Sequence, residues 1–306
     1  MKISPPVIKA LSEWGAVKEH EQLKHYTTYR TGGPADLLVL PRDIEAVSHI
    51  IGMVRDEKLP LTVIGGGSNL LVGDRGIEGI VLRLCEDDSR RAAMSVLGDG
   101  TIYTDAAASK ERFIDFAVDS GFSGIEFMAG IPGCIGGGII MNAGTFMGNF
   151  ADVVKDVDVV DGKGNRRVIA IDRSMAAYRH MNIGEDVYVT GARFRLPAAE
   201  DRAAVRKKVD DILADRKMKH PLDYPSAGSV FKNPKGHSSW KLINDAGLKG
   251  KSVGGACVSD LHTNFIINKN NATSLDIRDL INLVRETVYD KFRIDLEPEV
   301  KMIGMF

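Results

Sequence analysis

A run of three glycines gives the chain a candidate anion-binding loop. In the segment VIGGGSNLLV, from Val63 to Val72, the three glycines follow an apolar run and precede a serine and an asparagine. Glycine lets a backbone come close to a ligand, and consecutive backbone amides can hold a phosphate without a helix behind them. A tight turn explains the same residues, so both interpretations stay open at this point.

The loop matches neither of the two common nucleotide-binding patterns. A dinucleotide fingerprint needs Gly-x-Gly-x-x-Gly and then a helix, but Leu70 stands at the last glycine position. Gly73, Asp74 and Gly76 follow too soon for a helix to begin. The Gly-Lys-Ser/Thr of a Walker loop is also absent. If the loop binds a phosphate, it does so outside a Rossmann or P-loop fold.

A second glycine-rich segment, GIEFMAGIPGCIGGGIIMNAG, extends from Gly124 to Gly144 and contains seven glycines and one proline. Each glycine in a helix interior costs about 1 kcal/mol relative to alanine. The run Gly136–Gly138 therefore indicates a close backbone approach, by a flat or charged ligand or by a neighbouring element of the protein.

Three polar residues have side chains suited to chemistry and no local structural explanation. They are Arg179 in AAYRHM, Ser229 in YPSAGSVFKNP and Glu299 in LEPEV. Taken singly, each has an ordinary alternative: a surface ion pair, a turn hydroxyl and an exposed strand edge. Only their combination suggests a site.

Composition excludes several classes of function. The chain has 306 residues, enough for about two domains, and 44% of them are hydrophobic. Lys plus Arg is 40 and Asp plus Glu is 41, so the balance gives no reason to expect a nucleic acid or membrane partner. The N-terminus has no long apolar stretch of the kind found in signal peptides or membrane spans.

The cysteines and histidines predict neither a disulfide scaffold nor a metal site. Cys85, Cys134 and Cys257 are odd in number, far apart and not in Cys-x-x-Cys pairs, which suits a reducing cytoplasm. The seven histidines show no metal-ligand spacing, so no metal is expected.

Apolar periodicity predicts an α+β chain. Helices are expected near residues 42–58, 109–121, 198–221, 238–247 and 274–292. Strands are expected near residues 37–41, 61–64, 186–196, 254–259, 264–268 and 296–304, and a β-hairpin near 153–171. We place one domain at 1–200, with lobes of about 1–80 and 81–200, and a second domain at 201–306.

Seven segments occur in an order that resembles one known family. VIGGGSNLLV, AGIPGCIGGG, MNAG, YRH, PSAGSVFKNP, INDAGLKG and LEPEV lie between Tyr26 and Gly304. Together they resemble the UDP-N-acetylenolpyruvoylglucosamine reductase (MurB) family of peptidoglycan synthesis. The resemblance implies a two-lobed FAD-binding domain of the vanillyl-alcohol-oxidase (PCMH) type and a C-terminal α+β substrate-binding domain. It also implies non-covalent FAD, NADPH as hydride donor, and the shorter subtype without an extra tyrosine-bearing loop.

The resemblance assigns both glycine segments to the FAD. The implied cofactor residues are Ile64, Gly65, Gly66, Gly67, Ser68, Asn69, Gly130, Pro132, Gly133, Gly136, Gly137 and Gly138. For the UDP-sugar, the resemblance implies Lys219 and Asn233. Arg216, in the same basic cluster, is a further anion-site candidate. A solvated helix end is the alternative explanation of these basic residues.

The family reaction explains the three polar residues. A hydride adds to the terminal carbon of an enolpyruvyl ether, and negative charge develops as an enolate that must then be protonated. By resemblance, Arg179 is the stabilising cation, Ser229 the proton donor and Glu299 the third member of the set. Serine is a weak acid, and Lys232 is the nearby residue that could polarise it.

Two departures from the family pattern bear on pocket shape. Met181 stands where a serine is common, and Thr145–Phe150 reads TFMGNF where Ala-Tyr-Gly and an acidic residue are common. A flavin oxidase of the same superfamily and a non-catalytic binder of flavin or UDP-sugar are the competing functions. The sequence does not determine the oligomeric state, and a monomer is compatible with it.

Overall fold

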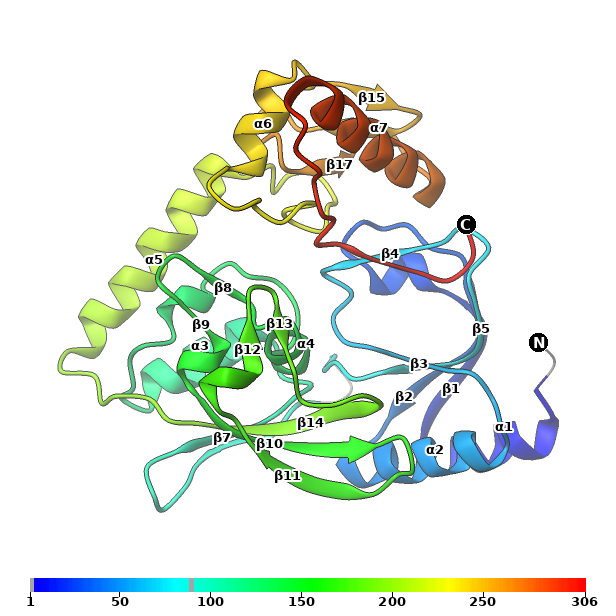
Figure 1. The fold of residues 1–306 in the computed structure, drawn as a ribbon. Coiled ribbons are helices and arrows are strands. Elements are labelled where there is room, and N and C mark those ends of the chain that lie inside the picture. Colours follow the sequence, from blue (N-terminus) through cyan, green and yellow to red (C-terminus); the bar gives the residue numbers. More distant parts are fainter. Residues whose placement is uncertain (1–2, 88–90) are drawn as a thin grey trace. The chain divides into compact units, whose positions relative to one another are not determined.

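The computed structural model describes residues 3–87 and 91–306, which fold into two compact units (Figure 1). The first unit contains residues up to Glu19, Leu37–Gly66 and Gly79–Asp215. The second contains His20–Asp36, Gly67–Glu78 and Arg216–Phe306. Each unit is therefore assembled from segments that are distant in the sequence, and each is described below by itself.

A four-stranded sheet in the order β1-β2-β5-β3 carries the first half of the first unit. Its strands are β1 (Gly15–Gln22), β2 (Pro34–Pro41), β3 (Leu61–Ile64) and β5 (Ile77–Arg83), with β3 parallel to β5. Helices α1 (Pro5–Ser12) and α2 (Ile44–Asp56) pack against it.

Helix α2 begins where the Asp43 carboxylate accepts a hydrogen bond from Ala46 N at 2.7 Å. Its buried face of Val47, Ile51 and Val54 agrees with the predicted periodicity.

A five-stranded antiparallel sheet in the order β11-β10-β14-β7-β6 forms the other half of this unit. The predicted hairpin is confirmed, because Val160 pairs with Arg166 across a glycine turn. Figure 1 shows α3, α4 and two short hairpins on one face of this sheet. The strands are β6 (Met94–Val96), β7 (Ile102–Asp105), β10 (Val154–Asp161), β11 (Arg166–Ala170) and β14 (Val187–Phe194).

Helices and hairpins pack against the five-stranded sheet and form a hydrophobic core with it. Phe113, Phe150 and Phe194 are fully buried there and stack edge to face or tilted against one another. The elements are α3 (Lys110–Asp119), α4 (Ile135–Ile140), α5 (Arg202–Lys219), the hairpin of β8 (Gly144–Thr145) with β9 (Gly148–Asn149), and the hairpin of β12 (Ala176–Ala177) with β13 (His180–Met181).

The second unit combines a three-stranded antiparallel sheet, β15-β16-β17, with two helices and one further strand pair. Its strand pair is parallel, with Lys301 opposite Leu70 and Ile303 opposite Val72. The elements are β4 (Leu70–Val72), β15 (Ser252–Val253), β16 (Ala256–Val258), β17 (Ile266–Asn268), β18 (Lys301–Ile303), α6 (Ser239–Asp245) and α7 (Ser274–Phe292).

Helix α7 shows the predicted buried face of Ile277, Leu280, Ile281, Val284 and Val288. Thr273 is the cap and accepts a hydrogen bond from Asp276 N at 3.0 Å. Ser274 is the first helical residue, and its hydroxyl donates to Val72 O at 2.5 Å.

The compact units do not follow a single cut in the sequence. The boundary between them in the C-terminal half falls at Asp215/Arg216, inside α5. The predicted FAD-binding and substrate-binding domains, divided at 200/201, are functional assignments and stay a prediction.

No helix within 3–87 and 91–306 is long and apolar enough to cross a membrane. The same ranges contain no cluster of three or more His, Cys, Asp or Glu side chains placed to hold a metal ion.

Candidate active site

Ser229 and Glu299 lie on two segments of the second unit that are hydrogen-bonded to each other. Glu299 N donates to Val230 O at 2.7 Å, and Lys232 N donates to Glu297 O at 2.9 Å. Asn264 holds the serine segment from the other side, because its side chain bonds both the N–H and the carbonyl of Phe231, at 3.0 and 2.9 Å. Two of the three predicted catalytic residues are thus brought together from positions 70 residues apart.

Asn69, one of the predicted cofactor residues, belongs to the same cluster. Its side-chain amide donates to Glu299 O at 3.0 Å, and Lys301 N donates to Asn69 O at 3.0 Å. The parallel pairing of β4 with β18 therefore fixes Asn69 beside Glu299. Ser68, Ser229 and Glu299 are all half-buried, so each residue is partly shielded from solvent and partly exposed to it.

The expected polarisation of Ser229 by Lys232 receives no support from the geometry. The Lys232 ammonium lies 2.6 Å from Glu297 Oε1, and the Glu297 side chain is 69% exposed. An ion pair of this kind contributes at most about 1 kcal/mol to stability. The charge of Lys232 is thus already engaged by a different carboxylate.

Arg179 occupies the tip of the β12–β13 hairpin in the first unit. Ala177 pairs with His180, so Tyr178 and Arg179 form a two-residue turn. Arg179 has φ 60, a left-handed conformation that is uncommon for a residue other than glycine. One guanidinium nitrogen donates to Gly144 O at 2.9 Å, and the group lies 5.1 Å from the centre of the Tyr178 ring. The hydrogen bond to Gly144 O and the contact with the Tyr178 ring restrain the guanidinium.

The glycines of the first loop serve different purposes. A Cβ on Gly67, which has φ +65, would lie 1.9 Å from Tyr26 O, so packing within the second unit requires that glycine. In the first unit, a Cβ on Gly66 would lie 2.9 Å from Gly133 Cα, whereas one on Gly65 would meet nothing closer than 3.9 Å. Ile64 ends β3 and is buried. Only Gly65 lacks a close protein neighbour that would explain it.

The same division holds in the second glycine segment. A Cβ on Gly136 would lie 3.0 Å from Ala106 Cβ, and one on Gly138 would lie 2.5 Å from the Phe150 ring. Gly137 is exposed and a Cβ there would meet nothing within 4 Å. Since packing explains the two outer glycines but not the middle one, Gly137 leaves room for a flat ligand against the backbone, as an FAD would require.

A buried lysine that the sequence analysis missed supports this segment. Lys110 is 4% exposed, and its ammonium donates to Pro132 O at 2.7 Å. Its backbone N–H bonds Gly133 O at 3.2 Å. Burial lowers the pKa of Lys110 to about 7. The helical periodicity could have indicated its burial, because Lys110 shares a face with Phe113, Ile114 and Ala117.

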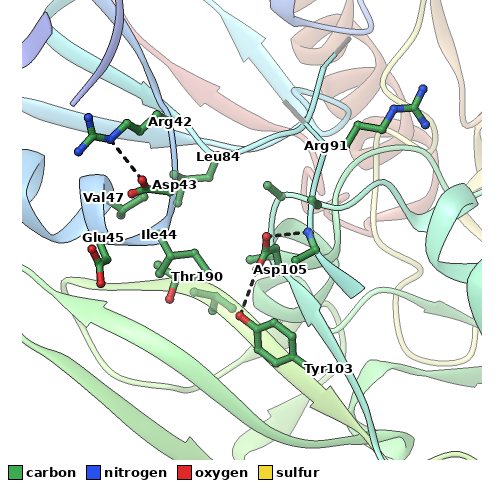
Figure 2. A pocket seen from close by; sticks show the side chains of 15 residues that line it. Arg42, Asp43, Ile44, Glu45, Val47, Leu84, Arg91, Tyr103, Asp105 and Thr190 are labelled. Carbon is green, nitrogen blue, oxygen red and sulfur yellow. Dashed lines mark hydrogen bonds and ion pairs between the residues drawn. The ribbon is translucent and has the colours of Figure 1, made fainter. Parts of the chain in front are cut away.

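A cavity of about 540 Å³ lies within the first unit (Figure 2), and three of its lining residues are neighbours of glycines in the two segments. Leu84, the residue nearest to Gly65, lines it, as do Ala106 and Val189, the neighbours of Gly136. The Tyr103 hydroxyl points to Asp105 and donates to Oδ1 at 3.0 Å, as Figure 2 shows. Burial, reinforced by the charge of Asp105, raises the pKa of Tyr103. Sequence patterns gave no sign of this cavity.

The predicted substrate residues lie in two places in the second unit. Arg216 and Lys219 are at the C-terminal end of α5, where Lys219 is exposed and Arg216 half-buried. Burial lowers the pKa of His262, and the Arg216 charge lowers it further. Asn233 is exposed, and its side-chain oxygen accepts from Ser239 N at 2.9 Å at the start of α6. Asn233 therefore also stabilises the start of α6, a structural role that the sequence did not predict.

The two departures from the family pattern have separate structural outcomes. Met181 belongs to β13, is 2% exposed and packs in the hydrophobic core of the first unit, so it fills apolar space. In the TFMGNF segment, Gly144–Thr145 pairs with Gly148–Asn149, and Phe146 at the tip is 98% exposed. The Arg179–Gly144 hydrogen bond links this hairpin to the arginine hairpin.

Two of the three cysteines are paired, so the prediction against cysteine pairing is wrong for them. Cys85 and Cys134 form a disulfide with their Cα atoms 6.1 Å apart, while Cys257 is free and buried. The two partners are separated by 49 residues in the sequence. Spacing along the chain could not reveal their proximity, because tertiary packing creates it.

Comparison with known proteins supplies the family. The family model described as "UDP-N-acetylenolpyruvoylglucosamine reductase, C-terminal domain" matches residues 220–303, and the model described as "FAD binding domain" matches 35–170. The chain is 38% identical over 298 residues to UDP-N-acetylenolpyruvoylglucosamine reductase of Caldanaerobacter subterraneus, covering 97% of each chain. It is 41% identical over 292 residues to that of Listeria monocytogenes, covering 94% of this chain and 95% of the relative.

A solved structure agrees with these matches. The crystal structure of UDP-N-acetylenolpyruvylglucosamine reductase (MurB) from Thermus caldophilus superposes with a TM-score of 0.77 at 31% identity. The superposition covers 94% of this chain and 99% of that one. The expected fold class, an FAD-binding domain of the PCMH type followed by a C-terminal α+β domain, is confirmed.

Proposed function

The chain belongs to the UDP-N-acetylenolpyruvoylglucosamine reductase family, and on that premise we propose how its residues divide the reaction. The enzyme is an FAD-dependent oxidoreductase of peptidoglycan precursor synthesis, a UDP-N-acetylmuramate dehydrogenase that reduces the enolpyruvyl ether of UDP-N-acetylglucosamine. The observation that carries the residue assignment is the hydrogen bond from Glu299 N to Val230 O, which places Ser229 and Glu299 on adjoining segments.

We assign the FAD to the two glycine segments and the cavity beside them. The chemistry that FAD supplies is the transfer of a hydride from NADPH to the substrate double bond. A Cβ on Gly65 or Gly137 would meet no protein neighbour closer than 3.9 Å, which suits the approach of a flat or anionic group. The adjoining cavity offers room for part of the cofactor. The remaining residues assigned to it are Ile64, Gly66, Gly67, Ser68, Asn69, Gly130, Pro132, Gly133, Gly136 and Gly138.

Arg179 is assigned to the negative charge of the enolate. A cation held in place before the reaction stabilises charge as it develops and spends no energy on reorganisation. The hairpin tip and the bond to Gly144 O give Arg179 that fixed position, and a planar guanidinium matches the geometry of a carboxylate.

Ser229 is assigned as the proton donor, and Glu299 as the third member of the set, which helps to organise or stabilise the enolate. The left-handed φ of +75 at Gly228 turns the chain immediately before Ser229. The carboxylate of Glu299 extends from a backbone fixed by Val230 and Asn69. A general acid at such a position contributes roughly 10² or more to the rate.

The UDP diphosphate is assigned to Lys219 and Arg216 at the end of α5. Exposed and half-buried cations on adjacent turns of a helix can bind the two phosphates together. Asn233 is assigned a substrate contact through its amide nitrogen, since its oxygen already bonds Ser239 N. We further propose that the enzyme is of the shorter subtype, acts in the cytoplasm, and needs no second copy for its chemistry.

Anaerobic absorbance spectroscopy of the purified enzyme tests this function. NADPH is expected to bleach the bound flavin, and the enolpyruvyl substrate is expected to restore its absorbance. A flavin oxidase would recover with oxygen and not with the enolpyruvyl ether. A non-catalytic binding protein would show no bleaching by NADPH. Either result would refute the proposal.

A further inference from the structure

The disulfide between Cys85 and Cys134 lies next to the contact between Gly66 and Gly133, which joins the two glycine segments. Cys85 follows β5, and Cys134 is the residue immediately before α4. A Cβ on Gly66 would lie 2.9 Å from Gly133 Cα and 3.3 Å from Cys134 Sγ. The sulfur of Cys134 therefore packs against the backbone of the first glycine loop.

The hydrogen bonds around the pair hold the two cysteines in alignment. Residues 106–109 run between the two cysteine segments: Glu86 N donates to Ala107 O at 2.8 Å, and Ile135 N to Ala108 O at 2.9 Å. Ser109 forms an antiparallel bridge with Cys134, and its N–H bonds the Glu86 carboxylate at 2.8 Å. None of these bonds involves a cysteine side chain. They can persist when the sulfurs are reduced, so the thiols stay close enough to pair again.

Cleavage of the disulfide changes the space that the sulfurs need. Bonded sulfurs are about 2.05 Å apart, whereas non-bonded heavy atoms need roughly 3.5 Å or more. Cys134 is 2% exposed and has Gly66 against its sulfur, while Cys85 is half-buried. After reduction, the Cys134 sulfur that packs against Gly66 is no longer tied to Cys85.

We infer that Cys85 and Cys134 are a reversible thiol–disulfide modification site whose oxidised form holds the two glycine segments in the arrangement that retains FAD. The coupling to FAD rests on the proposed cofactor site, whereas the thiol chemistry does not. Oxidation fixes the Gly66–Gly133 contact before the ligand arrives, so less ordering remains to be done on binding.

The oxidant is a small-molecule disulfide such as oxidised glutathione. The half-buried Cys85 thiolate attacks one of its sulfurs, forming a mixed disulfide and releasing one glutathione thiolate. The Cys134 thiolate then attacks Cys85 Sγ and displaces the second glutathione thiolate. The two cysteine thiols lose two protons and two electrons in total, and oxidised glutathione takes them up as two molecules of reduced glutathione.

The test compares the same protein in its two redox forms. Samples equilibrated with oxidised glutathione or with dithiothreitol are denatured, alkylated with a maleimide and weighed by mass spectrometry. The oxidised sample should carry one label, on Cys257, and the reduced sample should carry labels on all three cysteines. The apo-form of a second, undenatured portion of each sample is titrated with FAD, and binding is measured by the quenching of flavin fluorescence. The Kd should be about tenfold lower for the oxidised form, which corresponds to about 1.4 kcal/mol.

Two variants sharpen the comparison. Cys85→Ser lies outside the residues assigned to FAD, and its Kd should be the same under both treatments. Cys257→Ser removes the third thiol, which is buried and bonded to backbone carbonyls, and should keep the full redox response.

Free Cys85 and Cys134 thiols in excess oxidised glutathione would overturn the modification site. A Kd equal within a factor of two in the oxidised and reduced wild type would overturn the coupling. If neither form bound FAD, the cofactor assignment would fail and the coupling with it, while the label count would still decide the disulfide.

Discussion

Glu299 donates its backbone N–H to the carbonyl of Val230, at 2.7 Å. Val230 is the residue after Ser229, so this bond joins the segment of the proposed proton donor to the segment of the proposed carboxylate. Asn69 adds a hydrogen bond to the carbonyl of Glu299 at 3.0 Å. Because both bonds use the backbone of Glu299, the side chains of Ser229 and Glu299 can be changed without breaking the framework that positions them.

Replacement of Ser229 should separate the two halves of the reaction. Ser229→Ala removes the proton donor, which the transfer from NADPH to flavin does not need. Flavin reduction should stay near normal, and reoxidation by the enolpyruvyl substrate should slow by about 10² or more. Anaerobic stopped-flow spectroscopy at the flavin band measures each half.

Ser226→Ala is the matched control, since Ser226 is also half-buried and lies in the same turn. It should affect both halves much less. Equal slowing of the two halves by Ser229→Ala would show that the serine shapes the pocket and does not supply the proton.

Replacement of the charged residues should lower turnover more than substrate affinity. Glu299→Gln and Arg179→Ala remove interactions made mainly with the developing enolate, so kcat should fall by about 10² or more while the substrate Kd changes little. Arg179→Lys should restore only part of the rate, because an ammonium lacks the planar fork of a guanidinium, one nitrogen of which bonds Gly144 O. Steady-state kinetics and a substrate titration together give the answer, and near-normal kcat in either truncation would remove that residue from the catalytic set.

The middle glycine of Gly136–Gly138 should be needed for FAD, and its neighbour for stability. Gly137→Val adds a side chain where no protein atom lies within 4 Å, so FAD should be lost from a protein that still folds. Gly138→Ala adds a Cβ that would lie 2.5 Å from the Phe150 ring, so it should destabilise the fold by about 1–3 kcal/mol.

Flavin content and thermal unfolding distinguish the two effects. Full flavin occupancy in Gly137→Val would leave that glycine without a ligand role. Gly66→Val is a less clear test of FAD binding, because its side chain would also strike Gly133.

Stability should rise with pH through the titration of Lys110. Burial lowers the folded-state pKa to about 7 from 10.5, so between these values the unfolded chain binds more protons than the folded one. The free energy of unfolding should therefore gain up to about 1.4 kcal/mol per pH unit above pH 7 from this group. Lys110→Met should flatten that slope in urea denaturation of the apo-protein at pH 7, 8 and 9. An identical slope in the variant would mean that Lys110 stays charged when folded.

The flavin should be bound without a covalent bond. No histidine or cysteine is assigned to attach it, and the cysteine nearest the glycine loop is already paired with Cys85. Acid precipitation should release the yellow colour into the supernatant. Colour retained in the pellet would contradict non-covalent binding.

The sequence by itself determined the local elements and the family. Helix α7 and the hairpin of β10 with β11 formed as predicted, because an apolar period of 3.6 or 2 and a glycine turn depend on residues only a few positions apart. The motifs that carry the family resemblance are likewise short segments in a fixed order. Recognition of the family did not require knowing which segments touch.

Tertiary structure alone decided which of these residues work together. Backbone hydrogen bonds join the segments that contain Ser229 and Glu299, and Cys85 meets Cys134 across 49 residues. The glycines also look alike in sequence, yet Gly138 is required by Phe150 while Gly137 faces open space. Which residues meet, and which glycines packing requires, depends on how distant segments pack. A contact between two segments is set by the shape and burial of both partners. The local sequence of either partner alone does not contain that information.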